Sequence, residues 1–179
     1  MSRIGKQPIA IPDKVTVSVD GQTVKVEGPA GTSERTFHRE VTITVEDNSV
    51  CVTRNNEGRI ARGQHGLTRT LVANMVAGVV KPFRKSIEIS GVGYRAEQVG
   101  QAVRLQVGLS HEVLHPIPDG VKATFENEKL VHFDSIDKQL VGQLTAALRA
   151  YRPCEPYNGK GIKYVGERVR RKEGKTGAA

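Results

Sequence analysis

The sequence predicts an α+β protein made of two similar domains that arose by internal duplication, each an antiparallel β-sheet packed against one α-helix, followed by a basic C-terminal extension. Three observations support this prediction. Short stretches of alternating apolar residues precede a single helical stretch, the same order of segments recurs later in the chain, and positive charge is concentrated at the carboxyl end.

The first half has the two-residue period of half-buried strands. Valine and isoleucine alternate with polar residues over positions 15–19, 24–26, 41–45 and 50–52, and residues 20–22 (DGQ) supply a turn. A helical period follows and must end before Pro82. Its expected core face is Ile60, Leu67, Leu71, Met75, Val76 and Val79.

The second half repeats the same segments in the same order. GQTVKV at 21–26 aligns with GQAVRL at 100–105, VTITV at 41–45 with VKATF at 121–125, and SVCVT at 49–53 with KLVHF at 129–133, at offsets of 79 or 80 residues. A second helix is expected to bury Leu140, Val141, Leu144, Leu148 and Tyr151, with Asp134, Ser135 or Asp137 as its N-cap. We therefore predict domains at 1–81 and 82–152, and an extension at 153–179.

Composition and charge narrow the class of protein. Only 37% of residues are hydrophobic and tryptophan is absent, so Val, Ile, Leu and Ala must form the cores. The net charge is +8. Residues 1–81 carry a surplus of +3, residues 82–150 a surplus of 0, and residues 151–179 a surplus of +5. This asymmetry indicates a polyanionic partner at the carboxyl end.

Cysteine content and the opening residues favour the cytoplasm. The two cysteines, Cys51 and Cys154, and an amino-terminal stretch without an apolar leader argue against secretion and a disulfide framework. The longest nearly apolar run, residues 71–80, contains Asn74 and is far shorter than the roughly 20 residues of a membrane helix. No membrane span is expected.

HEVLH at residues 111–115 matches the zinc-protease pattern HExxH, which binds zinc only on a helix. The repeat aligns it with the strand region near residues 32–35, and Pro116 and Pro118 disfavour a helix. On a strand, positions i and i+4 lie about 13 Å apart, whereas zinc needs each nitrogen within about 2 Å. We expect a strand or hairpin, and a metallopeptidase is the alternative that metal analysis would test.

Two other patterns have structural explanations. GVG at residues 91–93 lacks the third glycine of a dinucleotide turn and predicts a tight bend between strands. Arg59, Arg62 and Arg69 cluster in the first helix, where a solvated face is the expectation and RNA contact the alternative.

The carboxyl-terminal stretch combines the residue types that suit folded RNA. Pro153 and Pro156 end the second helix, glycines flank Lys160, and tyrosines and cations alternate. Lysine and arginine bind phosphate, glycine allows close approach of a backbone, and tyrosine stacks on unpaired bases. A solvated, disordered terminus is one alternative, and an adaptor that binds an acidic protein is another.

Several of these segments closely resemble the family of bacterial large-subunit ribosomal protein six. They are SRIGKQPIAIP at 2–12, GVGYRA at 91–96, LRAYRPCEPYNGKGIKY at 148–164 and RRKEGK at 170–175. The chain departs from the family at Asn158, where lysine is usual, and at Cys154, where proline is common. The missing cation at Asn158 puts one phosphate contact in doubt.

The resemblance implies a cytoplasmic, non-enzymatic protein without cofactor or metal. Its second domain and extension are expected on 23S rRNA at the stalk base, beside neighbouring large-subunit proteins and the region where translation factors bind. The expected RNA-contacting residues are Tyr157, Asn158, Lys160, Lys163, Tyr164, Arg168, Arg170, Arg171, Lys172 and Lys175.

Overall fold

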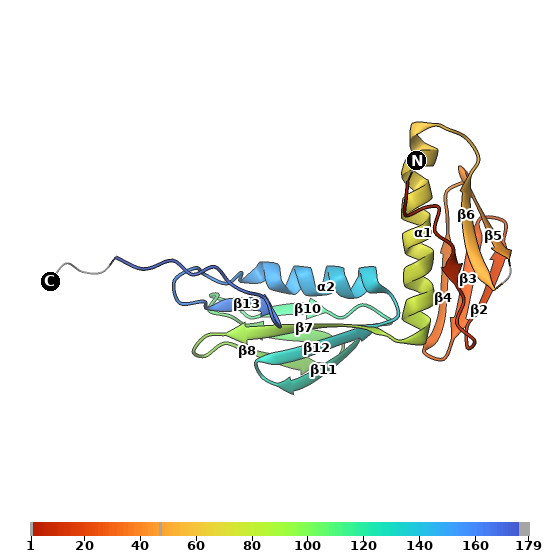
Figure 1. The fold of residues 1–179 in the computed structure, drawn as a ribbon. Coiled ribbons are helices and arrows are strands. Elements are labelled where there is room, and N and C mark those ends of the chain that lie inside the picture. Colours follow the sequence, from red (N-terminus) through yellow and green to blue (C-terminus); the bar gives the residue numbers. More distant parts are fainter. Residues whose placement is uncertain (1, 47, 176–179) are drawn as a thin grey trace. The chain divides into compact units, whose positions relative to one another are not determined.

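A computed structural model describes residues 2–46 and 48–175, and its contacts divide the chain into two units (Figure 1). The first contains residues 1–82 with Ile136–Lys138, and the second contains Phe83–Ser135 with the residues from Gln139 onward. Both units combine antiparallel strands with one long helix. The predicted α+β class and the duplication are confirmed.

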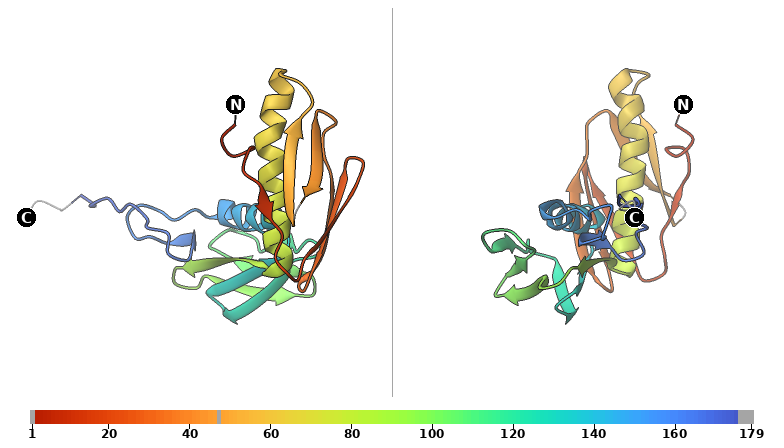
Figure 2. Two further views of the ribbon diagram at one scale, coloured as in Figure 1. Left: turned by 45° about the vertical axis from the view of Figure 1, so that its right-hand side comes forward. Right: turned by 90° about the vertical axis from the view of Figure 1, so that its left-hand side faces the viewer.

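The first unit holds two three-stranded sheets and helix α1. One sheet has the order β2-β3-β4 and the other the order β1-β6-β5. The elements are β1 (Ile9–Ala10), β2 (Thr16–Asp20), β3 (Thr23–Gly28), β4 (Gly31–Thr36), β5 (Val41–Glu46), β6 (Ser49–Arg54) and α1 (Arg59–Val80). Figure 2 shows α1 lying along one face of its own strands.

The second unit repeats this arrangement around helix α2. Its sheets have the orders β10-β9-β8 and β11-β12-β7-β13. The elements are β7 (Phe83–Ser90), β8 (Arg95–Val99), β9 (Ala102–Gln106), β10 (Val113–Pro116), β11 (Lys122–Asn127), β12 (Leu130–Ser135), α2 (Lys138–Tyr151) and β13 (Gly161–Tyr164).

The order of strands in the sheets shows which strands are equivalent in the two units. Strands β2-β3-β4 correspond to β8-β9-β10, and β1-β6-β5 corresponds to β7-β12-β11. Each unit therefore has two sheets where the sequence suggested one. In the part of the chain that the structure describes, β13 has no counterpart in the first unit.

Helix α1 buries the carboxyl-terminal half of its predicted face but not the amino-terminal half. Met75, Val76 and Val79 are buried as predicted. Ile60 is 61% exposed and Leu67 is 50% exposed, so the prediction is wrong for both. The buried face starts at Ala61 and runs at helical spacing through His65 and Thr68 to the valines of the carboxyl-terminal half. His65 belongs there because its Nε2 lies 3.0 Å from the Val52 carbonyl oxygen.

Helix α2 buries the middle of its predicted stripe but not its two ends, since Leu140 is only half-buried. Val141, Leu144 and Leu148 are buried against the core formed with β7 and β12, whereas Tyr151 is 38% exposed. The helix begins at Lys138. Asp137, one of the three predicted N-caps, lies directly before it.

The HEVLH stretch is not helical. Val113–Pro116 form strand β10, and His111 precedes it. The Nδ1 atom of His115 instead lies 3.0 Å from the Tyr151 hydroxyl. Across residues 2–46 and 48–175, no group of three or more His, Cys, Asp or Glu side chains is placed to hold a metal ion.

Two further expectations concern local backbone and membrane crossing. Gly91 has φ 150° and Gly93 has φ 74° in the connection between β7 and β8, which confirms the predicted bend. Neither described helix combines the length and the apolar character that crossing a bilayer requires.

Candidate nucleic-acid interface

The start of the predicted extension belongs to a sheet of the second unit. Strand β13 pairs antiparallel with β7, with Ile162 opposite Ile89 and Tyr164 opposite Ile87. Ile162 is fully buried in the core. Sequence reasoning missed this strand, although Ile162 and Tyr164 alternate with polar residues after a glycine, which is a weak strand signal.

The chain returns to the sheet by a close backbone crossing that only glycine permits. Gly161 has φ 141°, and a Cβ at this position would lie 2.7 Å from the carbonyl oxygens of Arg152 and Pro153 and from the Cα of Cys154. The next amide, that of Ile162, donates to the Arg152 carbonyl oxygen at 2.7 Å. The crossing thus fixes β13 against the end of α2.

A closed loop before β13 presents part of the predicted site. The Gly159 amide donates to the Glu155 carbonyl oxygen (3.1 Å), and the Glu155 amide donates to that of Lys160 (3.0 Å). Lys160 and Asn158 are exposed, and Tyr157 is 55% exposed. Three predicted contact residues therefore share one ordered loop.

The basic segment after β13 turns back onto this loop. The Lys172 amide donates to the Pro156 carbonyl oxygen at 2.9 Å. A Cβ built on Gly159 would lie 3.3 Å from Nη2 of Arg171, so the Arg171 guanidinium group lies over that glycine. Residues 155–160 and 168–172 consequently form one folded lobe, which we call the basic lobe.

Glu167 and Arg149 join the basic lobe to helix α2. Arg149 donates from Nη2 to Glu167 Oε1 (2.5 Å) and from Nε to Oε2 (3.1 Å), and the Tyr164 amide donates to the same Oε2 (3.0 Å). The bonds from Arg149 and from the Tyr164 amide lower the pKa of the Glu167 carboxyl. We call this arrangement the Glu167 clasp.

Two of the predicted contact residues have partners inside the protein. Lys163 Nζ lies 3.1 Å from Glu88. The Tyr164 ring lies beneath Lys85 Nζ, 4.9 Å from the ring centroid, and Arg149 approaches the same ring at 5.7 Å. In this arrangement Lys163 supports the strand pair and Tyr164 supports the clasp.

The other cations of the extension face outward. Within the described part of the chain, they are exposed and make no ion pair: Lys160, Arg168, Arg170, Arg171, Lys172 and Lys175. Residues 176–179 of the predicted extension lie outside the described residues. The exposed set provides six positive charges on or next to one lobe.

The first-helix arginines differ in their surroundings. Arg69 donates to the backbone oxygens of Gln7 (3.1 Å) and Pro8 (3.4 Å), so it holds the amino-terminal segment. Arg59 and Arg62 are exposed.

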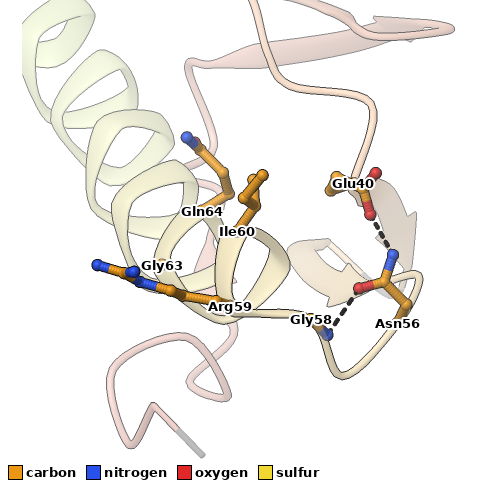
Figure 3. Close-up of a pocket in the computed structure, with 7 residues that line it drawn as sticks. All are labelled: Glu40, Asn56, Gly58, Arg59, Ile60, Gly63 and Gln64. Carbon is orange, nitrogen blue, oxygen red and sulfur yellow. Dashed lines mark hydrogen bonds between the residues drawn. The ribbon is translucent and has the colours of Figure 1, made fainter.

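Arg59 also lines a pocket of about 750 Å³ at the start of α1 (Figure 3). Asn56 lines it, accepts a bond from the Gly58 amide at 2.8 Å and donates to Glu40, the one carboxylate in the lining. Apolar Ile60 and Gly63 line the pocket as well. This lining offers no pair of side chains suited to acid–base or nucleophilic catalysis.

Neither unit shows an activated nucleophile among its described cysteines. Burial raises the pKa of the Cys154 thiol, which favours the unreactive protonated form at neutral pH. Cys51 is half-buried on β6.

Comparison with known proteins supplies the family. The model of the family described as ribosomal protein L6 matches residues 11–81 and 90–165. Similar relatives include proteins named large ribosomal subunit protein uL6 from Acaryochloris marina (54% identity, 99% of each chain), Microcystis aeruginosa (53% identity, 99% of this chain and 94% of the relative) and Anaeromyxobacter dehalogenans (51% identity, 100% of each chain). The first matched segment lies in the first unit, and the second lies in the second unit apart from Ile136–Lys138, as the duplication requires. The chain therefore belongs to the ribosomal protein L6 family.

Proposed function

We propose that the protein binds 23S rRNA in the large ribosomal subunit through its second unit and basic lobe. As a member of the ribosomal protein L6 family, it is a structural ribosomal protein and not an enzyme. The names of the relatives support assembly into the large ribosomal subunit, and we place that ribosome in the cytoplasm. The lobe supplies the RNA-binding surface, and the two cores hold it in place.

The observation that carries this proposal is the ordered cationic surface of the lobe. Its exposed lysines and arginines have no acidic partner among the described residues, so they remain available for phosphate oxygens. Binding them to a sugar-phosphate backbone releases counterions and adds affinity. The surplus of +5 in residues 151–179 makes this end the strongest site for such contact.

Individual side chains take distinct roles in the proposed complex. Lys160, Arg168 and the residues 170–172 contact phosphates, and Lys175 extends this row. Tyr157, with 55% of its surface exposed, stacks on a base or packs on a ribose. At Asn158, where the family usually has lysine, the side-chain amide contacts the RNA by hydrogen bonds instead of by a positive charge. Lys163 and Tyr164 contribute by shaping the lobe.

The proposed position is at the base of the stalk, next to the region where translation factors bind. Neighbouring large-subunit proteins are the further partners there, and contact with translation factors is transient. No cofactor, metal or membrane takes part.

The test is the salt dependence of binding to transcribed 23S rRNA. Six phosphate contacts give a slope of log affinity against log salt of about −5, from roughly 0.9 per contact. Replacing Lys160, Arg168 and Arg170 together by serine should make the slope about 2.7 units shallower. Lys14→Ser, an exposed cation of the first unit, is the control and should leave the slope unchanged.

A truncated chain gives a second test. Ending it after Glu167 retains β13 and the clasp, whereas ending it before Pro153 would also remove the buried Ile162. The chain that ends after Glu167 should fold and lose binding. Wild-type affinity that does not change with salt, or binding unaffected by this truncation, would show that the lobe is not the RNA site. Crosslinking in cell extract should yield RNA adducts of the lobe, whereas protein adducts alone would support the adaptor alternative.

A further inference from the structure

An acidic side chain lies at the centre of the basic segment. Glu167 is preceded by Lys163 and followed by Arg168 and the arginines beyond it. A carboxylate among phosphate-binding cations repels RNA, so its presence requires a compensating role. The contacts of the Glu167 clasp indicate what that role is.

The clasp fixes the direction in which the chain leaves β13. The Glu167 amide donates to the Tyr164 carbonyl oxygen at 3.0 Å, and the Glu167 carboxylate accepts the Tyr164 amide in return. These two bonds close a turn, and the bidentate bond from Arg149 ties that turn to α2. The next residues then run back along the loop, where Lys172 reaches Pro156.

The clasp is sheltered enough to hold this geometry. The Arg149 and Glu167 side chains are 33% and 27% exposed, so water and salt compete less for them than for a surface pair. The Tyr164 ring lies beside Arg149 and under Lys85, which restricts the guanidinium group further. Each partner is therefore held by more than one contact.

We propose that Glu167 is a positioning residue for RNA binding, which acts through Arg149 and the Tyr164 amide to pre-form the basic lobe. The proposal rests on the proposed function. A pre-formed lobe presents its cations in one arrangement, so less conformational entropy is lost when structured RNA binds. Glu167 itself does not contact the RNA.

The charge of Glu167 makes the proposal testable, because its two effects have opposite signs. Glu167→Gln removes a negative charge, and simple electrostatics then predicts tighter binding to any RNA. Loss of the clasp predicts weaker binding to the structured site. Glu173→Gln is the matched control, since Glu173 is exposed in the same segment. This substitution removes the same charge without touching the clasp.

The experiment measures the affinity of each variant for transcribed 23S rRNA and for polyuridylate at one salt concentration. For Glu167→Gln we expect a loss on the order of tenfold on 23S rRNA and no loss on polyuridylate. For Glu173→Gln we expect equal or slightly tighter binding to both. Exchange of the Tyr164 and Lys172 amides should accelerate in Glu167→Gln alone, which reports the released lobe.

Variants of Arg149 separate positioning from folding. Arg149→Lys keeps the charge but cannot form the bidentate bond, so it should lose part of the affinity with the core intact. Combining Arg149→Gln with Glu167→Gln should cost little more than the larger single effect, because both changes break the same clasp. Arg149→Lys also keeps the test valid if Glu167→Gln unfolds the unit.

The results distinguish this inference from the proposed function. Wild-type protein that binds 23S rRNA no better than polyuridylate overturns the proposed function. The positioning role alone is overturned if Glu167→Gln keeps or strengthens the wild-type preference for 23S rRNA over polyuridylate. It is also overturned if Arg149→Lys binds 23S rRNA with wild-type affinity.

Discussion

Gly161→Ala tests whether the crossing at the end of α2 anchors the basic lobe. Gly161 has φ 141°, a conformation that side chains rarely allow, and the added Cβ would lie 2.7 Å from two carbonyl oxygens and one Cα. All three neighbours are backbone atoms. No side-chain rotation can relieve the contact, so either β13 shifts or the strain remains.

The structure gives the size of the effect. Backbone strain at a glycine-only conformation costs about 1–3 kcal/mol, and overpacking costs a further 1–3 kcal/mol or so. The lower entropy of the unfolded alanine chain offsets about 0.4–1 kcal/mol. We therefore expect a loss of about 1–6 kcal/mol, centred near 3 kcal/mol.

Two other glycines in the same segment form a graded control series. Gly166 has φ 82° and nothing within 4 Å of an added Cβ, so alanine there meets strain without a clash and should cost about 1 kcal/mol. Gly174 has neither strain nor a neighbour, so Gly174→Ala should leave the free energy of unfolding unchanged. The predicted order is Gly161, then Gly166, then Gly174.

Urea unfolding followed by circular dichroism measures the free energy of the three variants. Hydrogen exchange of the Ile162 amide, which donates to the Arg152 carbonyl oxygen, shows whether β13 detaches before the rest of the unit unfolds. A Gly161→Ala protein within about 0.5 kcal/mol of wild type, with Ile162 still protected, would refute the reasoning. So would a larger loss at Gly174.

Three further predictions concern other parts of the molecule. Arg149 lowers the pKa of the Glu167 carboxyl below its ordinary value of 4.5. The clasp should therefore contribute its full stability above pH 4.5 and lose it as the pH falls through the folded pKa. The difference in unfolding free energy between wild type and Glu167→Gln should shrink on acidification. Gly5→Ala would place a Cβ 2.6 Å from the His65 ring, and thermal unfolding should show a loss of about 1–3 kcal/mol. Leu67→Ser, at a position that is 50% exposed, should change stability by less than about 0.5 kcal/mol, whereas a loss of several kcal/mol would mean that this side of α1 is core.

The duplication could be predicted because it depends on local patterns. Alternating valines and turn residues recur at nearly the same offset, and strand pairing preserves them in both copies. Helix burial was less predictable. The apolar side chain of Leu67 favoured its burial, yet the buried face begins with Ala61 and His65. Ala61 is small enough to pack closely, and the His65 ring reaches a carbonyl oxygen of strand β6.

The arrangement of the candidate site could not be predicted from local patterns. The basic composition identified the segment, but the partner of β13 is β7, which lies far upstream in the sequence. The clasp likewise joins Arg149 in a helix to Glu167 in a turn. In the sequence Glu167 is one acid among many cations, and only the fold gives it two donors.

The comparison of the two copies indicates why the second unit acquired the proposed RNA-binding role. In the first unit the strand equivalent to β7 is β1, which has two residues, and the chain leaves α1 directly for β7. In the second unit β7 has eight residues, and β13 pairs along its free edge. Residues 82–150 carry no net charge, so the positive surplus of the second unit enters with the segment that this edge anchors. In the proposed function, one added strand thus gives a duplicated body its RNA-binding surface by holding a cationic lobe. Grafting residues 152–175 after α1, where no eight-residue edge is available, should therefore leave the lobe unfolded.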